Sequence, residues 1–429
     1  VAEWTPAPAG ADHEGIFDEL MAKAAAPGIA ESKGAPEGAT PGRRFEHTFR
    51  RGYVAHAPIE PHAATATFED GRLTVWASTQ APFMLRDQLA SALGLDRAHL
   101  RVITPYVGGG FGGKAANPQA EEAARLARIT GRPVQVAFTR EEEFFFDTFD
   151  PVGIVKIASA CSEDGRITLW DYDVYFAGDR AAELTYDVPH VRRRFFRGRG
   201  PDGSVHRFAV GPWRAPGASL NVWARESQLD IMATAVGIDP LEFRLRNTTD
   251  ARMRRCLQEA ARRFAWTPSP GPSGRGWGMA CGVDSGTYAA LMVEVDVDRE
   301  RGTVAVERVV CAQDMGLVVN PEGATMQVEG SITMGLGYAL SEEVRFRGGR
   351  IVTDNFDTYA IPRFSVVPRT IETVLVQNDA LPPQGGGEPA IVPVGGAIAN
   401  AVFDATGARL FRLPITPDRL RAAIAAERG

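Results

Sequence analysis

The sequence has few of the residues from which proteins build disulfide frameworks and metal sites. It contains 429 residues, and only seven of them are histidine. The four cysteines are Cys161, Cys256, Cys281 and Cys311. No CxxC pair, HExxH motif or i,i+4 histidine pair is present. The sequence therefore excludes a disulfide scaffold and predicts that protein side chains do not ligate a metal directly.

An excess of positive charge and a long apolar run are also missing. The formal net charge of −6 argues against nucleic acid as a partner. We interpret the one basic stretch, residues 192–200, as a solvated or subunit-facing loop. No run predicts a membrane span, and Val1 begins no signal peptide, which suggests a processed or internal start. We expect a cytoplasmic chain, although a signal on a partner chain would allow the periplasm.

The length and the 44% of hydrophobic residues predict two or more domains with cores of their own. Strand and helix patterns are mixed without strict alternation, which favours an α+β fold. We expect a lead-in segment at 1–45, a first domain at 46–268 and a second domain at 269–429, with a linker at 269–276. Helices are predicted near 16–25, 218–237 and 251–264, after Asn117, which can cap the helix that follows it, and around two glycine-rich segments further on, the second ending at Gly407. Asp70-Gly71 predicts a hairpin.

The segment VGGGFGGKA, residues 107–115, lies between a predicted strand and a predicted helix. Gly108, Gly113 and Lys114 fit part of a P-loop, but Ala115 stands where that motif has Ser or Thr. A nucleotide-dependent enzyme is thus one interpretation. A second is a loop whose amides approach another anionic or oxo group, because glycines allow close backbone approach. A plain tight turn is the third.

A second glycine loop, GGGEP at residues 385–389, carries a glutamate just before an apolar helix. Partial removal of Glu388 from water would suit it to take up a proton near neutral pH. Alternatively, Glu388 satisfies free amides at the helix start. The residues alone leave both open.

Several polar side chains lie in apolar or loop-like surroundings. Gln80, Arg214 and Gln327 could each bind a polar ligand, although a structural hydrogen bond is the commoner role. His56 and Glu60 could form a polar pair, for which we favour a structural role.

Four separated motifs, in order, resemble one family. They are TPYVGGGFGGK, DPLEFRLRN, QVEGSITMGLGYALSEE and GGGEPAIVPVGGAIANAVFDATGARL. They are similar to the molybdenum-cofactor subunit of the xanthine dehydrogenase/aldehyde oxidase family, of the isoquinoline 1-oxidoreductase beta-subunit type. The resemblance implies two mixed α/β molybdenum-cofactor-binding domains with the cofactor at their interface.

The resemblance also implies a set of site residues. Glu388 matches the general base, and the cofactor would be molybdopterin, in the cytosine dinucleotide form, with its metal held by the pterin dithiolene. The matching cofactor-binding residues are Gln80, Gly109, Gly110, Phe111, Gly112, Arg214, Gln327 and Gly387. Phe111 would offer a backbone amide to an oxo group of the metal.

The implied reaction inserts water-derived oxygen at an electron-poor carbon of an aldehyde or N-heteroaromatic substrate. Electrons would leave through 2Fe-2S clusters on a partner subunit. A GQG segment that the family carries between the parts matching Leu245 and Gly282 is missing here, so we expect a second chain to supply it. A non-catalytic, cofactor-holding subunit is the alternative. Ala115 stands where many purine oxidisers have glutamate, and Ala215 where copper-containing enzymes have cysteine.

Overall fold

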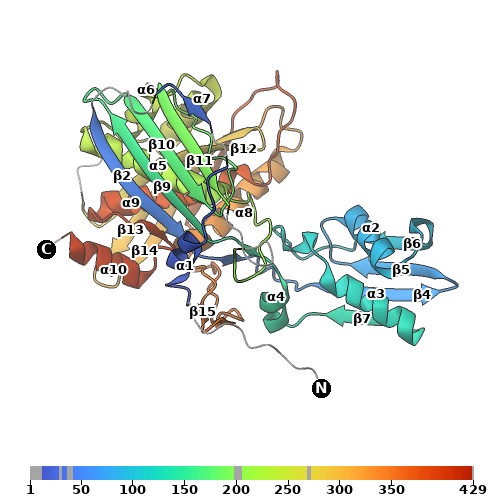
Figure 1. The fold of residues 1–429 in the computed structure, drawn as a ribbon. Coiled ribbons are helices and arrows are strands. Elements are labelled where there is room, and N and C mark those ends of the chain that lie inside the picture. The colour runs from blue at the N-terminus through green and yellow to red at the C-terminus, as the bar shows by residue number, and fades with distance from the viewer. Residues whose placement is uncertain (1–11, 29–30, 36–41, 198–204, 268–271, 428–429) are drawn as a thin grey trace.

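A computed structural model describes residues 12–28, 31–35, 42–197, 205–267 and 272–427. Its helices and sheets confirm the predicted α+β class. Figure 1 shows a large body and, beside it, a smaller lobe that residues 63–137 form. The hydrophobic core of the lobe is separate from the main core of the body.

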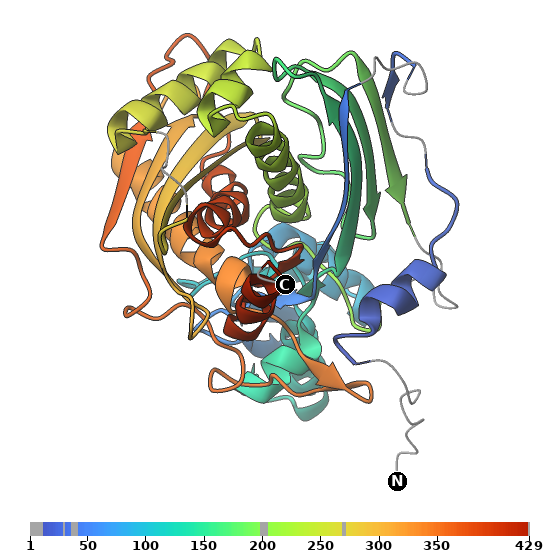
Figure 2. The same ribbon diagram turned by 90° about the vertical axis from the view of Figure 1, so that its left-hand side faces the viewer.

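Two sheets face each other in the large body with helices between them (Figure 2). The first, in spatial order, consists of β1 (Ser32–Lys33), β11 (His190–Phe196), β10 (Ile167–Tyr175), β9 (Gly153–Cys161), β2 (Arg43–Arg51) and β18 (Arg412–Leu413). The second consists of β12 (Arg275–Asp284), β13 (Thr287–Asp298), β14 (Thr303–Asp314) and β17 (Thr370–Leu375). The pairs β10–β11, β2–β18 and β14–β17 are parallel, and the remaining pairs are antiparallel.

Helices α5 (Ala218–Ala235) and α9 (Val394–Thr406) lie between the two sheets (Figure 2). Both are buried around most of their circumference. The residues of α9 are mostly apolar, whereas the buried residues of α5 include charged side chains such as Arg225 and Glu226, which pair with each other. Residues 389–406 are long and apolar enough to cross a membrane, but 89% of this window is buried inside the protein. This window is therefore a core segment of the body.

The other described helices surround this core. They are α1 (Ile16–Ala22), α4 (Arg140–Phe146), α6 (Pro240–Arg246), α7 (Ala251–Phe264), α8 (Pro321–Leu340) and α10 (Pro417–Ala426). Two short pairs, β3 (Val54–Ala55) with β8 (Phe149–Asp150) and β15 (Phe346–Arg347) with β16 (Arg350–Ile351), complete the body. Helices α7 to α9 confirm the helices predicted after residue 250, and Gly407, with φ of 79°, ends α9.

The lobe is a four-stranded sheet covered by two helices. Its strands, in spatial order, are β6 (Leu100–Ile103), β5 (Arg72–Ala77), β4 (Ala63–Glu69) and β7 (Val134–Ala137), and its helices are α2 (Pro82–Leu93) and α3 (Pro118–Thr130). Asp70 and Gly71 turn the chain between β4 and β5 with positive φ angles, which confirms the predicted hairpin. The sequence analysis did not separate this lobe from the rest of the predicted first domain.

Two local predictions were wrong. The basic stretch is strand β11 as far as residue 196, because Arg192 and Arg194 pair with Asp171 and Asp173 on the neighbouring strand; residues 198–200 lie outside the described residues. Asn117 precedes α3 but does not cap it, since its side-chain amide donates to the Ala115 carbonyl instead.

The predicted domain division at 268/269 stays a prediction. Residues 269–271 of the predicted linker lie outside the described residues, and β12 already begins at Arg275.

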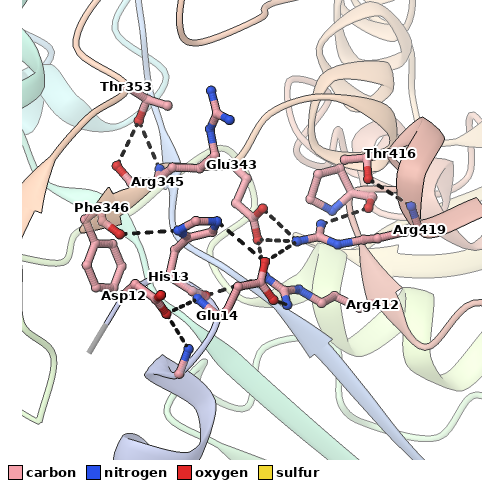
Figure 3. A network of polar contacts seen from close by, with 12 residues as sticks. Asp12, His13, Glu14, Glu343, Arg345, Phe346, Thr353, Arg412, Thr416 and Arg419 are labelled. Carbon is pink, nitrogen blue, oxygen red and sulfur yellow. Dashed lines mark hydrogen bonds and ion pairs between the residues drawn. The ribbon is translucent and has the colours of Figure 1, made fainter. Parts of the chain in front are cut away.

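Ion pairs connect the lead-in segment to the C-terminal part of the body (Figure 3). Glu14, just before α1, pairs with Arg412 of β18, and Glu343 accepts a hydrogen bond from Arg419 of α10 at 2.9 Å. Ile16, Phe17 and Leu20 of α1 are buried in a core that also contains Phe346. The described part of the lead-in is thus an integral part of the fold, whereas residues 1–11 lie outside the described residues.

A carboxylate at the centre of the body joins its helices and the second sheet. Glu226, on α5, is fully buried and accepts from the guanidinium groups of Arg244, at 2.9 Å, and Arg225, at 3.2 Å. It also accepts from the hydroxyl of Tyr186 and from the backbone N–H of Cys281 on β12. Two buried guanidinium groups therefore depend on one carboxylate.

Replacing Glu226 by glutamine should be strongly destabilising, because it leaves buried positive charge without compensation. We expect the free energy of unfolding to fall by about 3–5 kcal/mol, measured by urea denaturation. The matched control is Glu242→Gln, whose exposed carboxylate pairs with Arg246 on the surface of α6. It should change stability by less than about 1 kcal/mol. Equal losses in the two variants would contradict this role of Glu226.

Candidate functional site

The first glycine loop has a backbone shape that larger residues would not allow. Gly109 and Gly112 have φ angles of 96° and 117°, and Phe111 between them has 54°. A Cβ on Gly112 would overlap the carbonyl oxygen of Pro212. Glycine is therefore required here both for its φ and for its lack of a side chain.

The loop presents unpaired backbone donors. Among the residues that the structure describes, the N–H groups of Gly109, Gly110 and Phe111 have no hydrogen-bond acceptor. The next N–H, of Gly112, donates to the Gln80 side-chain oxygen at 3.0 Å, which leaves the amide nitrogen of Gln80 free as a donor. Successive free N–H groups in a turn of alternating handedness form a concavity that attracts anionic or oxo groups. This geometry favours the second interpretation of the loop.

Lys114 is not placed like the lysine of a nucleotide loop. Its side chain is fully buried, and its ammonium group pairs with Glu60 at 2.9 Å. Glu60 also accepts from the N–H of Gly108. Lys114 therefore attaches the loop to the segment that carries Glu60. Because Glu60 already neutralises the charge of Lys114, a phosphate ligand at this position is disfavoured. The predicted pair of His56 with Glu60 does not form, because His56 bonds Asp147 instead.

Arg214 joins the two halves of the chain. Its backbone N–H donates to the Phe111 carbonyl at 2.9 Å, so this residue holds the glycine loop. Its guanidinium group donates to the Gly387 carbonyl at 2.6 and 2.9 Å and to the Gln327 side-chain oxygen at 2.8 Å. The Nε and Nη2 groups of Arg214 are thus used by protein acceptors, whereas its Nη1 and the amide nitrogen of Gln327 have no acceptor among the described residues.

Glu388 lies next to this arrangement. One carboxylate oxygen accepts from the N–H of Ala215 at 3.1 Å, and the other pairs with Arg180. The side chain is 38% exposed, so it faces the site and is less removed from water than its apolar sequence context predicted. It makes no side-chain bond to the start of the short helix that follows, η4 (Pro389–Ile391), which argues against the capping interpretation.

The sequence analysis missed Arg180, which follows the end of β10. Its guanidinium group forms two hydrogen bonds with the buried carboxylate of Asp284, at 2.6 and 2.7 Å. Burial alone would lower the pKa of Arg180, but its bonds and charge interactions with Asp284 and Glu388 outweigh this effect and raise it. The available signal was an arginine placed directly after the long apolar strand pattern ending at Gly178.

All of the sequence-predicted site residues come together. Hydrogen bonds connect Gln80 to the glycine loop, the loop to Arg214, Arg214 to Gln327 and Gly387, and the neighbouring Ala215 to Glu388. The site therefore draws on the lobe, the start of α5, α8 and the segment before α9. The catalytic and cofactor-binding roles of these residues stay predictions.

Comparisons with known proteins give the family. Residues 24–248 and 234–368 match two family models, each described as a molybdopterin cofactor-binding domain. The chain is 32% identical over 426 residues to a subunit of the nicotinate dehydrogenase of Pseudomonas putida, covering 90% of this chain and 35% of that protein. It is 31% identical over 389 residues to the beta subunit of isoquinoline 1-oxidoreductase of Brevundimonas diminuta, covering 85% of this chain and 49% of that one.

Among solved structures, quinoline 2-oxidoreductase from Pseudomonas putida 86 superimposes with a TM-score of 0.83. The sequence identity is 17%, and the match covers 99% of this chain and 82% of the other, so it shows the shared fold. The chain belongs to the molybdopterin cofactor-binding domain family, as a molybdenum-binding subunit of the xanthine dehydrogenase/aldehyde oxidase type. It spans 35% and 49% of the lengths of the two curated relatives.

Gly112→Ala should distort the loop, because the added methyl group meets the Pro212 carbonyl as well as an unfavourable φ. We expect a loss of more than about 3 kcal/mol in the free energy of unfolding or, if the loop rearranges instead, faster amide exchange at residues 108–116. Gly131→Ala is the control: its φ is also positive, at 63°, but its Cβ would meet nothing within 4 Å. It should cost about 1 kcal/mol. Equal effects of the two substitutions on unfolding free energy and on amide exchange would show that the Pro212 contact is unimportant.

Proposed function

We propose that this chain is the catalytic molybdenum-binding part of a hydroxylase that oxidises aldehydes or N-heteroaromatic compounds. The observation that carries this proposal is the set of unpaired N–H groups at Gly109 to Phe111, which faces no acceptor in the described chain and lies in the hydrogen-bonded network that includes Glu388. The names of the relatives, which include a nicotinate dehydrogenase and an isoquinoline oxidoreductase, support this substrate class.

The residues present fit a molybdopterin. A Cβ at Gly110 would meet the side-chain oxygen of Gln80, and one at Gly112 would meet the carbonyl oxygen of Pro212, so glycine lets the loop pack in the shape that leaves its N–H groups free. The free amide nitrogens of Gln80 and Gln327 are suitable donors to oxo and pterin oxygens. No group of three His, Cys, Asp or Glu side chains within the described ranges could hold a metal ion, which is consistent with a metal held by its pterin ligand.

When bound, the cofactor would supply a metal that acidifies water and accepts two electrons. The chain's own contribution begins with Glu388, which would accept a proton at its carboxylate. One of its oxygens pairs with Arg180, so proton uptake at that oxygen requires this ion pair to open. The N–H of Ala215 holds the other oxygen in place, so the carboxylate keeps its orientation while Arg180 shifts.

We further propose the cytosine dinucleotide form of molybdopterin, 2Fe-2S clusters on a partner subunit, and a second chain that supplies the missing part of the cofactor domain. The relatives are named as subunits of larger enzymes, which supports an assembly of several chains. A cytoplasmic location remains a prediction. Elemental analysis of the intact complex, with mass spectrometry of the released pterin, tests the cofactor form directly.

Glu388→Gln should leave the molybdenum and pterin contents of the assembled complex unchanged. Turnover of nicotinate, isoquinoline or benzaldehyde with an artificial electron acceptor should fall by about 10²–10⁴-fold, because the general base is lost. Glu300→Gln, in an exposed turn, is the control and should behave as the parent protein. Unchanged turnover in a molybdenum-containing Glu388→Gln complex would favour the alternative of a non-catalytic, cofactor-holding subunit.

A further inference from the structure

The segment HAPIEPH, residues 56–62, lies against the glycine loop and its neighbours and contacts them at three points. The Nε2 atom of His56 bonds the carbonyl of Pro212, at 2.8 Å, two residues before Arg214. Glu60 accepts from the N–H of Gly108, where the loop begins. The Nε2 atom of His62 bonds the carbonyl of Ala116, at 3.2 Å, where the loop ends.

On its other side each histidine contacts a carboxylate, from within α4 or from the residue that directly follows it. The Nδ1 atom of His56 lies 2.8 Å from the Asp147 carboxylate, and that of His62 lies 2.9 Å from the Glu143 carboxylate. The carboxylates are four residues apart and therefore face the same side of the chain. Both histidines are buried.

Both ring nitrogens of each histidine therefore face acceptors. A neutral imidazole carries only one N–H and would leave one carboxylate or carbonyl oxygen without a donor. An imidazolium ion donates from both nitrogens and satisfies all four contacts. With both carboxyl groups ionised, the hydrogen-bond geometry thus favours two imidazolium ions.

The surrounding charges agree with this requirement. The charged groups near His56 are Asp147 at the end of α4, Asp150 on β8 and Arg51, which pairs with Asp150. This set is neutral only when His56 carries a positive charge.

The groups around His62 balance in the same way. They are Glu143 and, further away, Asp147 on the α4 side, and Lys114 in the loop, which is paired with Glu60. With Asp147 assigned to His56, the remaining groups are neutral only when His62 is charged. Burial alone would lower the pKa of each histidine, but the bonds to Asp147 and Glu143 outweigh it and raise the pKa.

We propose that His56 and His62 are positioning residues that, as a pair of imidazolium ions, hold the glycine loop in its binding shape, and that losing their protons releases the loop. The effect of this loop release on cofactor retention rests on the proposed function. Because the folded pKa of each histidine lies above its ordinary value near 6.5, their stabilising contribution is complete below about pH 6.5. It is lost as the pH rises through the raised folded pKa values.

The first test reads the protonation states directly. In NMR spectra of the full chain labelled at the histidine Cε1 carbon, the seven signals are followed from about pH 6 to about pH 9 and assigned with His56→Gln, His62→Gln and His99→Gln. His99 is exposed and serves as the reference. We expect the His56 and His62 signals to keep imidazolium shifts at neutral pH. Neutral shifts at both buried positions would overturn the proposal.

The second test reads the loop in the chain without cofactor. Gly112, Gly113, Ala115 and Ala116 donate their N–H groups to acceptors, so their exchange with deuterium reports the loop shape. After correction for the intrinsic pH dependence, exchange at residues 108–116 should rise at least about tenfold as the two histidines lose their protons. In His62→Gln it should be faster already at neutral pH, with only the smaller further rise that the deprotonation of His56 causes, whereas His99→Gln should follow the parent. A parent-like pH profile in His62→Gln would contradict the proposal.

The third test concerns the assembled complex. Molybdenum retained after desalting at increasing pH should fall in parallel with the loss of the two imidazolium signals, and His62→Gln should retain at least about tenfold less at neutral pH. Retention in His62→Gln equal to that of the parent at every pH would contradict the inferred role. A parent complex without molybdenum would refute the proposed function, while the first two tests would still decide the role of the histidines.

Discussion

The ion network around Glu226 is the constraint on which the arrangement of the body depends. This carboxylate lies on α5, between the two sheets, and connects that helix to Arg244 of α6 and to the backbone of β12. The carbonyl of the same residue accepts from Asn400 on α9. Helix α5 therefore cannot slide or rotate without separating buried charges, which would cost several kcal/mol. Its first turn, and the residues just before it, are fixed as a consequence.

That fixed start carries the residues around which the site is assembled. Arg214 and Ala215 precede α5 by a few residues. The N–H of Arg214 donates to the glycine loop, and the N–H of Ala215 donates to Glu388. The loop belongs to the lobe and Glu388 precedes α9, and both bond this short stretch of backbone, which sets their separation. A small displacement of α5 would thus change the distance between the unpaired N–H groups and the carboxylate. The interior charge network and the geometry of the site are mechanically linked.

Features fixed by local chemistry could be predicted from the sequence, and features fixed by distant partners could not. The turn at Asp70-Gly71, the end of α9 at Gly407 and the two glycine loops each depend on a few neighbouring residues with special backbone freedom. By contrast, nothing near Arg180 in the chain announces Asp284, with which it pairs. The segment from His56 to His62 could not be understood without α4, because its carboxylate partners lie 91 and 81 residues away in the chain. For the same reason residues 192–196, predicted to lie in a loop, form a strand: their partners lie on β10.

Backbone strain is concentrated around the same charged contacts. Eight described residues other than glycine have positive φ, and five of them are Ala57, Phe111, Ala181, Ala215 and Ser285. Each of these either lies in the glycine loop or adjoins a residue that clamps the site. Conformations of this kind cost about 1–3 kcal/mol each and persist only where surrounding contacts impose them.

The pair of Arg180 with Asp284 illustrates how this strain is maintained. Its two hydrogen bonds connect a residue beside Ala181 to a residue beside Ser285, so one ion pair fixes two strained turns on different segments. Relaxation at either turn would move the guanidinium group that also contacts Glu388. The orientation of the Glu388 carboxylate therefore depends on both of its partners. Ala215 connects it to the interior charge network, and Arg180 connects it to the two strained turns.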